Sequence, residues 1–188
     1  MNSRARLHCT RSSTRELYKG VPVRPLEGIK VLDLSRVLAG PFAGRILHDL
    51  GAEVVKVEPP EGDVTRNWGK VRAGLAGYYT QQNAGKSNVC IDLRAEGGPE
   101  LVRRLAAEAD VLIENFRPGI MKKFGLGYED LKAINKKLVM LSISGFGQEG
   151  PESGRAAYAP ILHGESGWLQ RSAEWNEQPV TDLNLSAA

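Results

Sequence analysis

The sequence has few of the residues that mark several classes of protein. Only two cysteines, Cys9 and Cys90, occur among 188 residues, so there is no disulfide framework and a reducing compartment is predicted. The three histidines are scattered along the chain, so no metal-ligand spacing is visible and we predict no metal site. No apolar run approaches the roughly 20 residues that a membrane helix needs, so we predict no membrane span.

Several short motifs are also missing. No G-x-G-x-x-G follows the first predicted strand, and the G-x-S-x-G of serine hydrolases is absent. The stretch "TQQNAGKS" (80–87) comes close to a phosphate-binding loop, but Thr80 replaces its first glycine. A strand-like segment follows it, so no helix N-terminus would face a phosphate. We therefore do not predict a phosphate-binding loop here.

The net charge is small, and only the N-terminal segment is distinctly basic. The net charge is +3, which suits an anionic ligand but does not indicate nucleic acid. Residues 1–24 are basic, rich in Ser and Thr, and carry Glu16 as their single acid. This is typical of a mitochondrial transit peptide, and equally of a disordered leader or a start codon assigned too early. We predict a cytoplasmic protein, with the mitochondrial matrix as the alternative.

After residue 24, strand-like and helix-like segments alternate. Strands are predicted at 29–35, 52–59, 87–93, 111–116 and 139–147, and helices at 40–52, 98–110 and 128–138. In the first helix, Phe42, Ile46, Leu47 and Leu50 form one apolar face. Alternation of this kind predicts an α/β fold with a mostly parallel, Rossmann-like sheet flanked by helices.

Polar residues follow the apolar strands at the ends where such sheets bind ligands. "ADVLIENFRPG" (109–119) begins as a buried strand and then turns to an amide, an aromatic and an arginine. Residues 35–40 and 144–147 stand at equivalent ends. Ligands bind at the carboxyl ends of parallel strands, so these ends are candidate site segments, although a plain exit from strand to loop is the alternative.

Two carboxylates are the main candidates for chemistry. Asp33 lies inside an apolar strand, where a hydrogen-bonded structural acid is the favoured interpretation. Asp182 lies in "QPVTDLNLSAA", on an extended exit into small residues. Taken alone it is typical of a loop or helix-capping aspartate.

The chain resembles the class III CoA-transferases, the family of formyl-CoA, carnitine-CoA and succinyl-CoA:dicarboxylate transferases. The resemblance lies in residues 25–66, in "VLIENFRPGIMKKFGLGYEDL" (111–131), in "LSISGFGQEGP" (141–151) and in "PVTDLNLSAA" (179–188). It implies that residues 25–188 are the N-terminal part of the CoA-binding large domain of a two-domain fold. Family members are roughly twice as long and form interlocked homodimers, so the C-terminal half of the family pattern is missing from this sequence.

The resemblance also implies the residues of the site. Asp182 matches the catalytic aspartate. The positions implied for CoA are Val37, Leu38, Ile91, Arg94, Asn115, Phe116, Arg117, Lys123, Arg155 and Tyr158. Three positions depart from the family pattern: Leu38 and Pro59 stand where some members have glutamine and arginine, and Ala159 replaces a frequent aspartate.

The implied activity is transfer of CoA from an acyl-CoA to a small carboxylic acid through an anhydride and an aspartyl-CoA intermediate on Asp182. CoA is then a substrate, and neither nucleic acid nor a membrane is an expected partner. One alternative is an α-methylacyl-CoA racemase, which would need a histidine where Tyr158 stands. Another is a catalytically inactive CoA-binding fragment.

Overall fold

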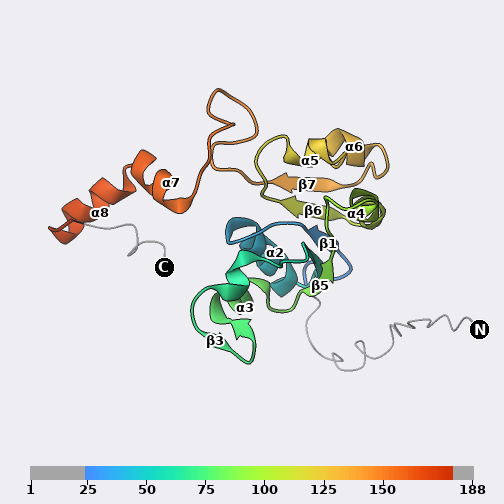
Figure 1. The fold of residues 1–188 in the computed structure, drawn as a ribbon, viewed down its shortest axis with the longest axis horizontal. Helices are drawn as coiled ribbons and strands as arrows, with labels where there is room; N and C mark the ends of the chain where they lie inside the picture. The colour runs from blue at the N-terminus through green and yellow to red at the C-terminus, as the bar shows by residue number, and fades with distance from the viewer. Residues whose placement is uncertain (1–23, 180–188) are drawn as a thin grey trace, which may run out of the picture.

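The computed structural model describes residues 24–179 and shows one main parallel sheet (Figure 1). Its strands are β1 (Lys30–Asp33), β2 (Glu53–Glu58), β5 (Ser87–Cys90), β6 (Val111–Glu114) and β7 (Val139–Ser142). They lie in the order β5-β2-β1-β6-β7, and each neighbouring pair is parallel. The predicted α/β class with a Rossmann-like parallel sheet is therefore confirmed.

Two helical layers cover the two faces of this sheet. One core cluster joins Leu32 and Leu112 to Val102 of α4 (Gly98–Ala106), Met121 of α5 (Ile120–Lys123) and Leu131 of α6 (Tyr128–Lys132). The other packs alternate strand residues against α2 (Ala39–Asp49). Successive strand side chains point to opposite faces, so near-continuous apolar strands can fill both layers.

Helix α2 contacts the sheet through small residues and Leu47, so only Leu47 of the predicted apolar face packs against the core. Gly40, Pro41 and Gly44 are buried, whereas Phe42, Ile46 and Leu50 are 53%, 43% and 41% exposed. Close approach explains this arrangement. A Cβ on Gly40 would lie 2.1 Å from the Cβ of Ser35, and one on Gly44 would lie 2.7 Å from Oδ2 of Asp33.

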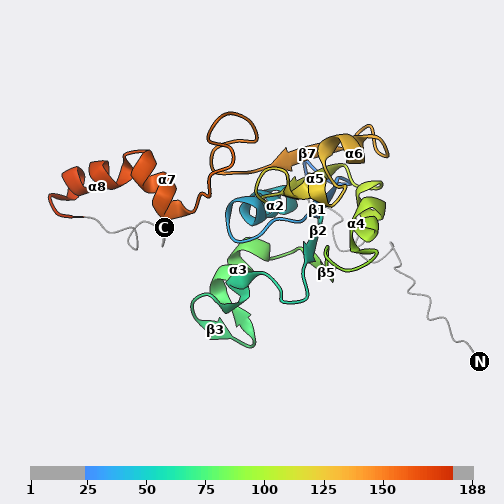
Figure 2. The same cartoon turned by 45° about the horizontal axis from the view of Figure 1, so that its top comes forward.

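The polar stretch between β2 and β5 contains short elements that the sequence analysis treated as loop. These are a 3₁₀ turn η1 (Val64–Asn67), a hairpin of β3 (Val71–Arg72) and β4 (Leu75–Ala76), and helix α3 (Gly77–Asn83). They sit beside α2 near the end of β2 (Figure 2). This small unit supplies several polar side chains to the neighbourhood of the strand ends.

After β7 the chain runs to two further helices, α7 (Ala159–Glu165) and α8 (Trp168–Asn176), which project from the body in both views (Figures 1 and 2). Neither has a buried residue. Residues 1–23 and 180–188 lie outside the described part of the chain. The predicted basic leader and Asp182 therefore have no structural description here. No helix in residues 24–179 is long and apolar enough to cross a membrane.

Candidate functional site

The strand order reverses direction between β1 and β6. The chain runs outward from β1 through β2 to β5, then returns to β6 on the other side of β1 and continues to β7. Doubly wound sheets bind ligands at this switch point, outside the carboxyl ends of the strands. Here those ends are the segment after Asp33 and the segment after Glu114. Two of the candidate site segments predicted from the sequence therefore meet at one edge of the sheet.

A pocket of about 190 Å³ opens beside this edge. Its wall is mostly apolar, and its rim carries charged groups. The lining residues are Leu34, Arg36, Val57, Pro59, Glu61, Ile91, Asp92, Leu93, Arg94, Phe116 and Phe124. The volume is below the roughly 300–1,000 Å³ typical of pockets that enclose a whole drug-sized ligand, so it suits one ring system of a larger molecule.

Arg94 is the principal cation on the rim of the pocket. Its guanidinium lies 3.1 Å from the carboxylate of Glu61 and 3.2 Å from that of Asp92, and its side chain is 67% exposed. Hydrogen bonds from the backbone N–H and the side chain of Arg94 hold the pKa of Asp92 below its usual value. Exposed ion pairs such as these are weak, so an anionic ligand could replace Glu61 and Asp92 as the partner of Arg94.

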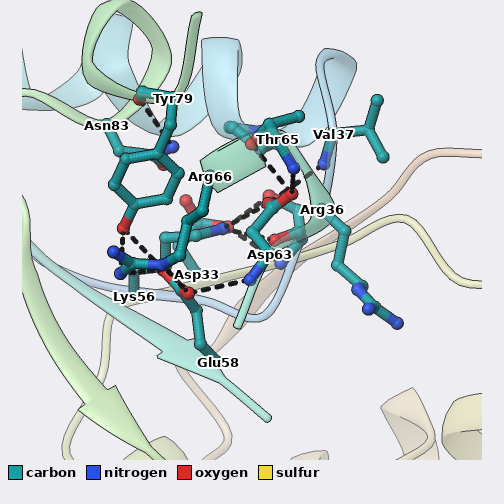
Figure 3. A network of polar contacts seen from close by, with 12 residues as sticks. Asp33, Arg36, Val37, Lys56, Glu58, Asp63, Thr65, Arg66, Tyr79 and Asn83 are labelled. Carbon is teal, nitrogen blue, oxygen red and sulfur yellow. Dashed lines mark hydrogen bonds and ion pairs between the residues drawn. The ribbon is translucent and has the colours of Figure 1, made fainter. Parts of the chain in front are cut away.

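The segment after β1 is held by side chains from other segments (Figure 3). Oδ1 of Asn115 accepts from the N–H of Arg36 at 2.7 Å, and Nδ2 of Asn115 donates to the C=O of Arg36 at 2.7 Å. Val37 has a φ of +69°, and its N–H donates to Oδ2 of Asp63 at 3.1 Å. Asn115 thus ties the end of β6 to the end of β1.

Two buried ion pairs lie directly beneath this segment. Lys56 and Asp63 are 3.3 Å apart, Lys86 and Asp33 are 2.8 Å apart, and all four side chains are at most 1% exposed. Asp33 also accepts from the N–H of Ser35 at 2.9 Å and from its hydroxyl. The interpretation of Asp33 as a structural acid is therefore supported by its contacts, and the lysine of "AGKS" points into the protein rather than toward a phosphate.

A third buried carboxylate, Glu58, closes β2. It accepts hydrogen bonds from Arg66 at 2.7 and 3.0 Å, from the hydroxyl of Tyr79 at 2.6 Å and from the N–H of Asp63 at 2.9 Å. Burial alone would raise the pKa of Glu58, but these bonds outweigh it and hold the pKa at about 2. Burial and the bond to Glu58 raise the pKa of Tyr79, which keeps its hydroxyl as the donor.

We expect this network to make the fold sensitive to acid. The pKa of Glu58 falls from 4.5 to about 2 on folding, so its stabilising effect is full above pH 4.5 and is lost as the pH drops toward 2. The free energy of unfolding should fall by about 2–3 kcal/mol across that window from this group. Urea unfolding of wild type and Glu58→Gln at several pH values measures it. The variant should be less stable at pH 6 and show a flatter acid limb, whereas Glu53→Gln, on the exposed part of the same strand, should follow the wild-type curve.

Glu114, at the end of β6, is in a different situation. It is 3% exposed, and burial raises its pKa despite hydrogen bonds from Ser142 and from the N–H of Phe116 at 2.8 Å. Its carboxyl group fixes the turn that carries Phe116 to the pocket. Glu114 therefore supports the site without facing the pocket.

The structure brings together some of the predicted CoA residues. Ile91, Arg94 and Phe116 line the pocket, and Lys123 directly precedes its Phe124. Val37, Leu38 and Asn115 lie at the adjacent strand ends, and Arg117 is exposed just beyond them. Asn115 uses its amide to hold Arg36, so its predicted hydrogen bond to pantetheine stays a prediction.

Arg155 and Tyr158 lie elsewhere, in the chain that leads to α7. Arg155 pairs with Glu152 at 2.8 Å and with Glu165 at 2.5 Å, and Tyr158 is 69% exposed. Neither lines the pocket. Their predicted contact with CoA stays a prediction.

Sequence reasoning missed the residues beneath the site. Lys56 interrupts the otherwise apolar run of β2, and Asp63 follows the Pro-Pro-Glu-Gly turn after it. A charged residue in a strand buried on both faces is itself a signal, because such a charge needs a partner.

In residues 24–179 no group of three or more His, Cys, Asp or Glu side chains is placed to hold a metal ion.

Comparisons with known proteins agree with this geometry. The family model described as CoA-transferase family III matches residues 26–185. The succinate–glutarate CoA-transferase of Agrobacterium fabrum is 48% identical, covering 83% of this chain and 41% of its own. The human succinyl-CoA:glutarate CoA-transferase is 43% identical, covering 90% of this chain and 41% of its own. The crystal structure of a CAIB/BAIF family protein from Brucella suis superposes with a TM-score of 0.74 at 52% identity, covering 77% of this chain and 40% of that one.

Proposed function

The chain belongs to CoA-transferase family III, and on that basis we propose that it supplies the CoA-binding part of an enzyme that moves CoA from an acyl-CoA to a carboxylic acid. The chain spans about 41% of the length of the curated relatives it matches. The observation that carries the proposal is the apolar pocket at the switch point, lined by Ile91, Arg94 and Phe116.

The adenine ring of CoA fits the chemistry of this pocket. Phe116 and Phe124 offer aromatic faces for the ring, and Ile91 adds an aliphatic surface. Arg94 stands at the rim, where its guanidinium would form charge-assisted bonds with a phosphate of CoA. Arg36 also lines the pocket, and Lys123, exposed one residue before Phe124, would supply a further cation.

The pantetheine arm would then lie along the strand ends toward Val37 and Leu38. Helix α2 begins at Ala39, directly after this segment, and has no acidic residue in its first turn. Its N-terminus would therefore direct a positive dipole end toward the thioester region. Arg117 is exposed directly beyond Asn115, at the end of β6.

The chemistry is proposed to pass through Asp182, whose reference pKa of about 3.9 leaves it ionised at neutral pH. Its carboxylate attacks the acyl carbon of the donor, and the C–S bond breaks. CoA leaves as a thiolate, and a mixed anhydride of Asp182 and the acyl group remains. The thiolate attacks the aspartyl carbonyl, the anhydride C–O bond breaks, and the donor acid leaves. The acceptor carboxylate then reverses these two steps and carries CoA away.

The relatives indicate which acids to test first. Several are named for succinyl-CoA with glutarate, D-citramalate or L-malate, and one for acetyl-CoA with oxalate. We propose succinyl-CoA as the donor and a small dicarboxylic acid as the acceptor. A chain of the relatives' length is proposed to work as a homodimer. Racemase chemistry has less support, because Tyr158 stands where a histidine base would be needed.

Thermal unfolding of the 188-residue chain with free CoA tests the site. Binding to the folded state raises stability by about 2.7 kcal/mol at a hundredfold excess of CoA over Kd, so we expect the melting temperature to rise. Arg94→Ala should weaken CoA binding by roughly tenfold through loss of a phosphate partner. The charge-matched control is Arg104→Ala, an exposed arginine of α4 that does not line this pocket. Equal CoA shifts in wild type and Arg94→Ala would contradict the placement, and a wild-type chain indifferent to CoA would contradict the function.

A further inference from the structure

The segment after β1 contains an unusual backbone conformation. Val37 has a φ of +69°, a region that β-branched residues rarely enter because their side chain meets the backbone. Such residues persist when their surroundings over-determine them, and they gather at functional sites. Val37 also stands between the two strand ends of the proposed CoA site.

The contacts around Val37 account for its conformation. Lys56 Nζ donates to the C=O of Ser35 at 2.6 Å, and Asp63 Oδ2 accepts from the N–H of Val37 at 3.1 Å. Between them, Asn115 holds both backbone groups of Arg36. Every backbone N–H and C=O from the N–H of Ser35 to the N–H of Val37 is therefore hydrogen-bonded to a side chain.

Holding the segment after β1 with Lys56 and Asp63 carries a large desolvation cost. Both side chains are at most 1% exposed, and burying two charges often costs as much as their attraction returns. A glycine at position 37 would adopt the same φ without strain. The sequence instead keeps a valine, whose side chain points away from Asp63 (Figure 3). The arrangement therefore favours a role in shaping the surface at Val37 over a role in stabilising the fold.

We infer that Asp63 and Lys56 are positioning residues, which hold Val37 in the left-handed conformation so that the Val37–Leu38 segment presents a fixed surface to the pantetheine end of CoA. This inference rests on the proposed function. Asp63 and Lys56 are buried, so they act through the loop and do not touch the ligand. Asp63 is the central member because it contacts Val37, Thr65 and Lys56 at once.

Two substitutions around one carboxylate separate positioning from stability. Asp63→Asn removes the charge that faces Lys56 and weakens the bond to Val37. Thr65→Val removes only the hydroxyl bond to the other oxygen of Asp63, at 2.9 Å. Titration of the 188-residue chain with CoA should show affinity about tenfold weaker or more in Asp63→Asn, and within about twofold of wild type in Thr65→Val. Both variants should lower the melting temperature.

NMR gives a second readout that a merely structural role would not move. The HN–Hα coupling and Cα shift of residue 37 should report positive φ in wild type and Thr65→Val, and a shift toward negative φ in Asp63→Asn. Should Asp63→Asn fail to fold, Val37→Pro fixes φ near −65° with the ion pair intact, and CoA affinity should again fall. Wild-type affinity in a folded Asp63→Asn or Val37→Pro overturns the inference alone. A wild-type chain that binds no CoA overturns the proposed function and this inference with it.

Discussion

Replacing Asp182 with asparagine should abolish CoA transfer in the complete enzyme while leaving CoA binding nearly unchanged. Asparagine has the size of aspartate but no carboxylate oxygen to attack a thioester. We expect the transfer rate to fall by about a thousandfold or more, equivalent to about 4 kcal/mol of transition-state stabilisation. The measurement is transfer from succinyl-CoA to glutarate, with mass spectrometry of the enzyme after incubation with the donor alone.

The intermediate gives this prediction a direct signature. Wild type should carry an aspartyl-CoA adduct on the peptide that contains Asp182, and Asp182→Asn should carry none. The matched control is Glu174→Gln, an exposed carboxylate of α8 that bonds to its helix neighbours Gln170 and Arg171. Full transfer activity in Asp182→Asn, or an adduct on another residue, would show that this aspartate is not the nucleophile.

The strands, and the polar ends that mark the candidate site, could be predicted from the sequence because the strands are buried. β1, β2 and β6 are buried on both faces, so their apolar runs stand out from the amphipathic helices between them. Their polar ends then marked the strand tips, and the structure places the ends of β1 and β6 side by side. The pocket residues Ile91 and Phe116 followed from the resemblance, since nothing in their spacing alone indicates an adenine site.

The polar elements between β2 and β5 were not readable in the same way. Helix α3 is seven residues long and buries Tyr79, Gln82 and Asn83, so it shows no apolar periodicity. Helix α2 misled for the opposite reason. Phe42 and Ile46 on its apolar face are exposed, because Gly40 packs against Ser35 and Gly44 packs against Asp33 too closely to leave room for a side chain. Periodicity cannot reveal that a small-residue face is the buried one.

Lys86→Met should be the most destabilising of the substitutions considered in the body of the fold. Lys86 Nζ donates to Asp33 at 2.8 Å, to the C=O of Pro41 at 2.7 Å and to Asn83 at 3.0 Å. Methionine fills a similar volume but leaves the Asp33 carboxylate, which has no exposed surface, without its cation. Breaking a buried pair in this way costs about 3–5 kcal/mol, which for a chain of this size lowers the melting temperature by on the order of 10 °C.

The double variant Asp33→Asn/Lys86→Met decides whether the loss is electrostatic. Burial lowers the pKa of Lys86, and the neighbouring charge of Asp33 opposes that shift, so the charged form of Lys86 depends on its partner. Removing both charges should therefore recover a large part of the stability that either single change loses. Lys30→Met is the control, since Lys30 pairs with Glu108 at 3.8 Å on the surface and its loss should change stability by less than about 0.5 kcal/mol. If Lys86→Met unfolds at the same temperature as Lys30→Met, the pair does not hold α2 and α3 to the end of β1, and the support for the CoA site must come from Asn115, Lys56 and Asp63 alone.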